Sequence, residues 1–518
     1  MNLLDKTLVK FYLTRKVEYM PFRNISKYIF VIFLSILLLL INFPSRAQDT
    51  EDIDAHRALN EEEHQPRPAS FVRALIGMSF VMVPGIAWYY YENSNKRDQL
   101  FGKNDILNEY LTKPFALSKM KFDDNVFETN SPSHPLAGTA YYLSARTSGF
   151  NMWQSSLFTF GGSVFWECLI EIQEVTSIND MVFTPIGGIT IGEGLFQLAA
   201  FYAGNAKSQN FFNNFISDQV DIAKYRYTNG TGPNSSIWHN ICGFVGVLYE
   251  LDDMAGGKFG MEAEFFGIRN LKLHGTSSGF HLNSPYTKIV TSAAFSKKLQ
   301  EVFLYSETGI MGYSKQRITQ SGGYSSFFSL NSAFEYNNKN FADFHDKIST
   351  IHLLGPVADI SFIKGNFIIR LRNSIFYDFT MIESMGLPEY YIAGHTRDDV
   401  RNKGALCPSR TGYYYAQGFT AASMMAIDIY SFELGGEFML NRYYSFNGDG
   451  MTNDEPKYHE NFVMRDTRIS SKLFVQYSAK NNVAYKLGAT YSILKGKADG
   501  YSRRLSALRT EFLTAYCM

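Results

Sequence analysis

The chain has 518 residues and balances 49 Lys and Arg against 49 Asp and Glu, so its formal net charge is zero. Electrostatic capture of nucleic acid needs a basic face, so we expect no nucleic-acid partner. Aromatic residues are frequent, with 33 Tyr and 44 Phe, and the chain is long enough to build a large core.

A secretory signal is predicted at the N-terminus. Two cations precede an apolar run over residues 28–41, and small residues then lead to a cleavage site after Ala47. The alternative is a retained inner-membrane anchor, but the run is shorter than the roughly 20 residues that span a bilayer. We therefore set residues 1–47, which include an over-long start, apart from the fold. Residues 48–69 are predicted to form a flexible acidic leader.

The segment from 70 to 228 has helical, apolar periodicity and is predicted to form a helical region. His134, followed by a proline, indicates the start of one helix. A later helix is capped by polar residues at 177–180 and carries a face of small residues that allows close helix packing. That face consists of Thr184, Gly188 and Gly192.

A helix between these two is predicted over residues 154–175. On it Ser163, Glu167 and Glu171 recur every four residues, so a hydroxyl and two carboxylates share one stripe. Large apolar neighbours favour burial of the stripe, with Arg146 as the expected counter-ion.

These polar side chains within apolar helices predict a buried network, because an unpartnered buried polar group costs several kcal/mol, on the order of 2 to 7. We expect the structural members to be Asn130, Tyr142, Arg146, Ser163, Asn179 and Glu193. The alternative is a catalytic site with acid or base candidates His134, Glu167, Glu171 and Asp180.

Two more specific sites are tested by their motifs. The four acid or base candidates could together bind a metal. The helical region contains neither Glu-x-x-His nor His-Glu-x-x-His, the usual helical metal signatures, so we expect neither metal nor cofactor. A hydrolase triad of Ser163, His134 and a carboxylate lacks the Gly-x-Ser-x-Gly elbow. The structural network remains the preferred interpretation.

The segment from 229 to 518 alternates with period two, which predicts β-strands. Residues 485–493 place aromatic and aliphatic side chains on one face, with Lys, Gly, Thr and Ser on the other. Residues 473–479 repeat the pattern, and residues 480–482 form the turn between the two strands. The same alternation occurs over 259–265, 369–377 and 432–440.

Such strands would suit a soluble sandwich or a transmembrane barrel. Aromatic residues near strand ends, short turns and the long polar loops at 379–412 and 444–461 favour the barrel. We predict an α+β membrane protein, with an antiparallel barrel of roughly twelve strands preceded by a helical region packed in or against it. The helical region is expected in the lumen or on the periplasmic side. The non-aromatic end, Cys517 and Met518, departs from the usual terminal aromatic residue.

The polar helical stretch resembles a known family. The motif residues include Asn130, His134, Arg146, Ser163, Trp166, Glu167, Glu171, Ser177, Asn179, Asp180, Thr184, Gly192 and Glu193. They resemble the bacterial envelope family called domain of unknown function 3943, over roughly residues 122–194. The resemblance implies a Gram-negative outer-membrane protein, and the Ala47-Gln48 junction is similar to Bacteroidetes signal cleavage sites. It implies no reaction.

Three functional classes follow. The first is an outer-membrane barrel in transport or envelope organisation, with membrane lipid as a partner and a small-molecule or lipid ligand left open. The second is an envelope hydrolase acting on a lipid or glycan through His134, Glu167 or Glu171. The third is a polytopic inner-membrane protein, which period-two strands disfavour. Four cysteines, Cys168, Cys242, Cys407 and Cys517, form no CxxC pair, so no zinc ribbon is expected and no disulfide connectivity is fixed.

Overall fold

The computed structural model describes two stretches of the chain. The first runs from 69 to 205 with gaps at 93–119, 121, 124, 173 and 175. The second runs from 238 to 517 with gaps at 251–253, 267–274, 283–285, 341–344, 384–412, 447–463, 480 and 499–500. The predicted signal peptide and leader up to residue 68, and most of each long polar loop, lie outside these described residues.

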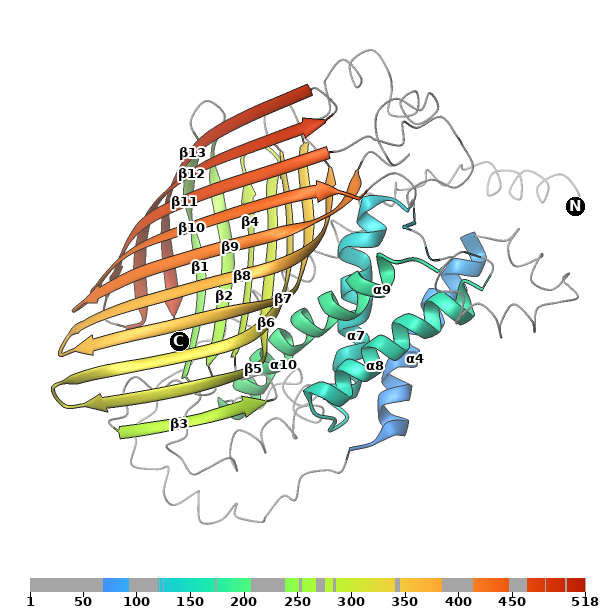
Figure 1. Cartoon of the computed structure of the whole chain (residues 1–518), viewed down its shortest axis with the longest axis horizontal. Helices are drawn as coiled ribbons and strands as arrows, with labels where there is room; N and C mark the ends of the chain where they lie inside the picture. The colour runs from blue at the N-terminus through green and yellow to red at the C-terminus, as the bar shows by residue number, and fades with distance from the viewer. Residues whose placement is uncertain are drawn as a thin grey trace, which may run out of the picture. The chain divides into compact units, whose positions relative to one another are not determined.

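Thirteen strands form one antiparallel sheet that closes on itself, as Figure 1 shows. The strands are β1 (Trp238–Glu250), β2 (Met254–Phe266), β3 (Gly275–Leu282), β4 (Tyr286–Phe295), β5 (Leu299–Thr319), β6 (Gly322–Asn340), β7 (His345–Lys364), β8 (Phe367–Glu383), β9 (Tyr414–Ile429), β10 (Phe432–Ser445), β11 (Met464–Ser478), β12 (Val483–Ala498) and β13 (Tyr501–Cys517).

Twelve of these strands form the ring. Strand β1 pairs with β13 at one junction and β5 pairs with β6 at another, so the ring is complete. Strand β3 pairs only with residues 311–318 of β5, beyond the part of β5 that pairs with β4. The predicted twelve-stranded antiparallel barrel is therefore confirmed.

Contacts between distant strands identify the inner face of the wall. Lys339 on β6 contacts Glu250 on β1 at 2.6 Å, although β5, β4 and β2 lie between them in the ring. Side chains of such strands can meet only on the concave side. Because residues alternate between faces, the register then assigns every other position to the outer face. Outward positions include large exposed apolar residues such as Leu473 (70 % exposed) and Leu487 (59 %).

The two ends of the barrel differ in their connections. Short turns join strands at one end, where Gly365, Tyr430, Asn481 and Asn482 have positive φ values of 59°, 53°, 66° and 63°. Such values are what tight hairpin turns require. The other end holds the connections at 384–412 and 447–463. We call these the short-turn end and the long-loop end.

The helical region contains four longer helices with irregular turns between them. The four helices are α4 (Phe71–Glu92), α7 (His134–Arg146), α8 (Met152–Phe165) and α10 (Gly188–Asn205). The short elements between them are η4 (Thr129–Ser133), η5 (Trp166–Ile170), α9 (Asp180–Val182) and η6 (Phe183–Gly187). Helices α7 and α10 touch through glycines, since a Cβ on Gly188 would lie 2.3 Å from the backbone carbon of Gly138. The small-residue face allows the close packing predicted for it.

Helix α8 ends earlier than the sequence predicts. The helix expected over 154–175 stops at Phe165 and continues as the single π-helical turn η5. The backbone N–H of Glu171 donates to the carbonyl of Trp166, five residues back, which closes a wide turn. The prediction of one α-helical stripe through Ser163, Glu167 and Glu171 is therefore wrong.

The helical region packs against outward-facing residues of the barrel. Ser306 on β5 donates to the carbonyl of Thr190 on α10 at 2.8 Å, and Ser306 alternates with the inward residues Tyr305 and Glu307. Lys347, another outward position on β7, contacts Glu128 at 2.7 Å. The expectation of a helical region against the barrel holds. The expected packing in the lumen does not fit these contacts, because both are made with outward-facing residues of the wall.

Candidate functional site

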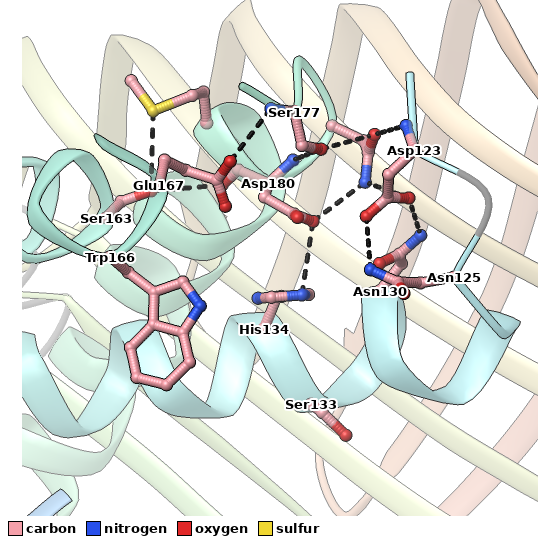
Figure 2. Close-up of polar contacts among 12 residues, drawn as sticks. Asp123, Asn125, Asn130, Ser133, His134, Ser163, Trp166, Glu167, Ser177 and Asp180 are labelled. Carbon is pink, nitrogen blue, oxygen red and sulfur yellow. Dashed lines mark hydrogen bonds and ion pairs between the residues drawn. The ribbon is translucent and has the colours of Figure 1, made fainter. Parts of the chain in front are cut away.

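One cluster of polar side chains joins the start of α7 to the 177–180 turn, and Figure 2 shows its contacts. Asp123 lies at its centre. One carboxylate oxygen of Asp123 accepts from Asn130 at 2.5 Å, from Asn179 at 3.1 Å and from Tyr415 at 3.0 Å. Asn179 also donates to Asp180 at 2.8 Å. We call this set, with His134, Glu167, Glu171 and Ser177, the acidic cluster.

His134 faces Asp180 within the acidic cluster (Figure 2). Its Nε2 atom lies 3.3 Å from the Asp180 carboxylate, whose side chain is 3 % exposed. Burial lowers the pKa of His134, and the nearby Asp123 charge opposes that effect. Burial also raises the pKa of Asp180 well above its usual range, and the carboxylates of Asp123 and Glu167 raise it further. Both changes in pKa favour the uncharged forms of His134 and Asp180.

The two glutamates that the sequence placed on one stripe have separate partners. Glu167 is buried and accepts from the backbone N–H of Ser177 at 2.9 Å. Glu171 accepts from the Trp166 indole at 3.0 Å. Burial, followed by the charge of Glu167, raises the pKa of Glu171 to about 8.

Ser163 does not form the nucleophile of a triad. Its hydroxyl donates to the backbone carbonyl of Asp180 at 3.3 Å and contacts the sulfur of Met181 at 3.9 Å. A serine activated by histidine would instead donate to the imidazole. The structure thus brings Ser163 near the acidic cluster without giving it a base.

Arg146 belongs to a second buried group, which we call the arginine cluster. Its guanidinium donates to Glu193 at 2.9 and 3.2 Å, so the predicted pairing with Glu167 and Glu171 is wrong. Tyr142 and Gln197 donate to the same carboxylate at 2.6 and 2.7 Å. Arg146 lies one turn beyond Tyr142 on α7, on the face that meets α10, and this direction selects Glu193.

The acidic cluster is also where the helical region meets strand β9. Asn130 donates to the hydroxyls of Tyr413 and Tyr415 at 3.0 and 2.8 Å. Asp123 and these tyrosines were missed by sequence reasoning. The tyrosines belong to the predicted barrel, and no local pattern links them to a residue more than 280 positions away.

The arrangement resembles a buried hydrogen-bonded network more than an open reaction site, although Asn130 Oδ1 and His134 Nε2 have no hydrogen-bond partner among the described residues. Each acidic side chain in the cluster accepts hydrogen bonds from named donors, and Asn130, Glu167, Asn179 and Asp180 are 0 to 2 % exposed. In the described ranges, no group of three or more His, Cys, Asp or Glu side chains is placed to hold a metal ion.

The cysteines, which the sequence left unassigned, are now placed. Cys242 on β1 and Cys517 on β13 form a disulfide across the junction that closes the ring. Cys168 is buried, and Cys407 lies outside the described residues.

Part of the chain is similar to several solved structures. The β domain of the Bordetella autotransporter BrkA matches at 10 % identity over 53 % of this chain and 97 % of that one, with a TM-score of 0.18. The translocator domain of autotransporter NalP from Neisseria meningitidis matches at 10 % over 61 % and 99 %, with a TM-score of 0.20. A porin matches at 8 % over 55 % and 100 %, with a TM-score of 0.20. The barrel assignment itself rests on the strand pairings above.

No curated protein matches the chain. The helical region is different, because a family model does match there, as its motif residues suggested. Residues 119–221 match the family described as "Domain of unknown function (DUF3943)", and the closed barrel follows that segment.

Proposed function

We propose that this protein is a non-conducting outer-membrane barrel that acts in envelope organisation and holds the helical region on its outer wall. The outer location is supported by the closed ring, the apolar outward positions and the short turns at one end, which together are typical of outer-membrane barrels. Transport through an open pore is the alternative role for such a barrel, and it has less support.

Ion pairs across the lumen carry the proposal. Arg468 on β11 contacts Asp346 on β7 at 2.7 and 2.9 Å, and Arg372 on β8 contacts Glu307 on β5 at 2.7 Å. Three other strands separate β11 from β7 in the ring, and two separate β8 from β5. An aqueous channel needs an uninterrupted lumen, whereas these side chains bridge it at several levels.

The helical region supports the scaffold interpretation. Helix α4 is the one described helix that is long and apolar enough to cross a membrane, and only 17 % of it is buried. Its exposed apolar side chains and the outward barrel contacts of α10 suit a position beside the wall, with lipid as the remaining neighbour. The acidic cluster then fastens this region to β9.

The hydrolase alternative has one supporting observation, the contact between His134 and Asp180. The Ser163 hydroxyl donates to the backbone carbonyl of Asp180 and not to His134, so the two do not form a nucleophile and base pair. We therefore assign the acidic cluster a structural role.

Conductance across a planar lipid bilayer tests the proposal. The purified full chain should give no steady open-channel current. Substituting Arg372→Ala and Arg468→Ala together should introduce a leak, because both bridges are removed. Arg370→Ala is the matched control, since Arg370 contacts only nearby strands of the wall among the described residues: Asp428 on the neighbouring β9 at 3.0 Å and Glu433 on the next strand, β10, at 2.8 Å. A large, stable current from the unchanged protein would refute the non-conducting barrel.

A further inference from the structure

Five cations gather on the outer wall of β10 to β13 near the long-loop end. We call them the basic patch, and they are Arg442, Arg465, Lys495, Lys497 and Arg504, all exposed. The register places them on the outer face: Lys497 pairs with Arg465, and both lie an even number of residues from the exposed outward residues Leu487 and Leu473.

An apolar band lies between the basic patch and the short-turn end. Along β12 the outward positions from Tyr485 to Ile493 are apolar or aromatic, and the two outward positions that follow are lysines. Such a stretch of about nine residues is the length with which a tilted strand crosses a bilayer. No outward position in the described parts of β10 to β13 holds Asp or Glu. The basic patch therefore lies where hydrocarbon gives way to headgroups.

Cations oppose one another within the basic patch. Lys495 is the direct ladder partner of Arg504, and Arg465 is the direct partner of Lys497. Like charges in directly opposite positions destabilise a sheet. Within the residues that the structure describes, the five form no ion pair with a carboxylate. An anion between the opposed side chains would remove this repulsion.

Two arginines of the basic patch are also held in place. The guanidiniums of Arg442 and Arg465 lie 5.3 and 5.6 Å from the centre of the Tyr444 ring. Arg442 is on the same strand as Tyr444, β10, and Arg465 on β11 is the ladder partner of Tyr444. A stacked guanidinium keeps its N–H donors in a fixed plane, which suits two-point contact with a phosphate.

We propose that the basic patch binds the phosphates of membrane lipid headgroups in the leaflet at the long-loop end. The two opposed pairs occupy successive outward rows, and successive rows on a strand are about 6.6 Å apart. A headgroup that carries two phosphates therefore fits better than a single phosphate. The depth just beyond the apolar band selects a lipid over a soluble anion.

Retention of lipid A tests the proposal. The full chain is purified in detergent with bisphosphorylated lipid A or its dephosphorylated form, and bound lipid is counted by mass spectrometry. The test variant carries Lys495→Gln and Arg504→Gln. The matched control carries Lys315→Gln and Arg317→Gln, a Lys and an Arg that are exposed on β5 beside the short turn at residues 320–321. Heat-modifiable gel migration confirms that each variant has folded.

The unchanged protein and the control should retain the bisphosphorylated lipid equally. The test variant should bind it roughly 30-fold more weakly. Each basic residue near a charged surface contributes about 1 kcal/mol to binding, and the variant lacks two of them. Equal loss in the test and control variants would overturn the proposal. So would equal retention of the dephosphorylated lipid, or complete displacement by millimolar inorganic phosphate, which would indicate a site for soluble anions.

Discussion

The arginine cluster makes the sharpest prediction about stability. Substituting Arg146→Met removes both hydrogen bonds to Glu193, the bond to the Phe150 carbonyl at 3.2 Å and the contact over the Phe196 ring at 4.1 Å. Glu193 stays behind with its side chain 0 % exposed, so its charge loses its counter-ion inside the protein. Breaking a buried pair in this way costs about 3 to 5 kcal/mol.

Amide hydrogen exchange along α7 and α10 measures this loss directly. At about 1.4 kcal/mol for each factor of ten, the variant should open roughly 150- to 5,000-fold more often. Adding Glu193→Gln should restore protection to within about tenfold of the original, because the neutral amide still accepts from Tyr142 and needs no counter-ion. Arg504→Met, an exposed Arg on β13, is the control and should leave α7 unchanged.

Two results would refute the reasoning about Arg146. In the first, the single variant changes exchange by less than tenfold. In the second, the double variant exchanges as fast as the single one, which would mean that lost packing and not a stranded charge is the cause.

Three further predictions concern other contacts. Asn130→Ala should weaken the attachment of α7 to β9 by about 1 to 3 kcal/mol, which limited proteolysis would detect as faster cleavage of the helical region. Asn125→Ala, at an exposed position, is the control and should change the cleavage rate little. Equal effects of the two substitutions would contradict this prediction. Glu171, with a folded pKa of about 8, keeps a proton that the unfolded chain releases near pH 4.3, so the stability of η5 should fall as pH rises between those values. Trp166 fluorescence in a chain without its other tryptophans reports this, and a slope that persists in Glu171→Gln would exclude Glu171 as its source. Replacing both Cys242 and Cys517 with Ser should lower the unfolding free energy by about 2 to 5 kcal/mol, and denaturation that is unchanged by reduction of the native disulfide would contradict that expectation.

The barrel could be predicted from sequence because its signal is local. The alternation over 485–493 can be recognised from neighbouring residues alone. Asn481 and Asn482 predict a turn because asparagine tolerates the positive φ values that a tight turn requires. Strand β3 could not be predicted as an extra member of the sheet. Strand β3 pairs with the part of β5 that β4 leaves unpaired, so its position depends on the register between β4 and β5.

The six residues predicted to form the structural network are all buried, but the partner predicted for Arg146 was wrong. Arg146 was assigned to Glu167 and Glu171 as the counter-ion of a stripe expected to be buried, but it lies on the face of α7 that meets α10 and pairs with Glu193. The π-helical turn at 166–170 interrupts the stripe itself. The tyrosines of β9 were missed for a different reason. Contacts between Asn130 and Tyr415 arise only after the barrel has formed and the helices have packed on it.

The disulfide between β1 and β13 has a consequence for any shortened form of this chain. The two bonded cysteines are 275 residues apart in sequence, so the ring closes only after the last of the described strands, β13, has been synthesised. A truncation before β13 removes one strand and also uncovers the free edges of β1 and β12. Unpaired edges recruit other chains, so the truncated protein should aggregate in the periplasm before it reaches a membrane.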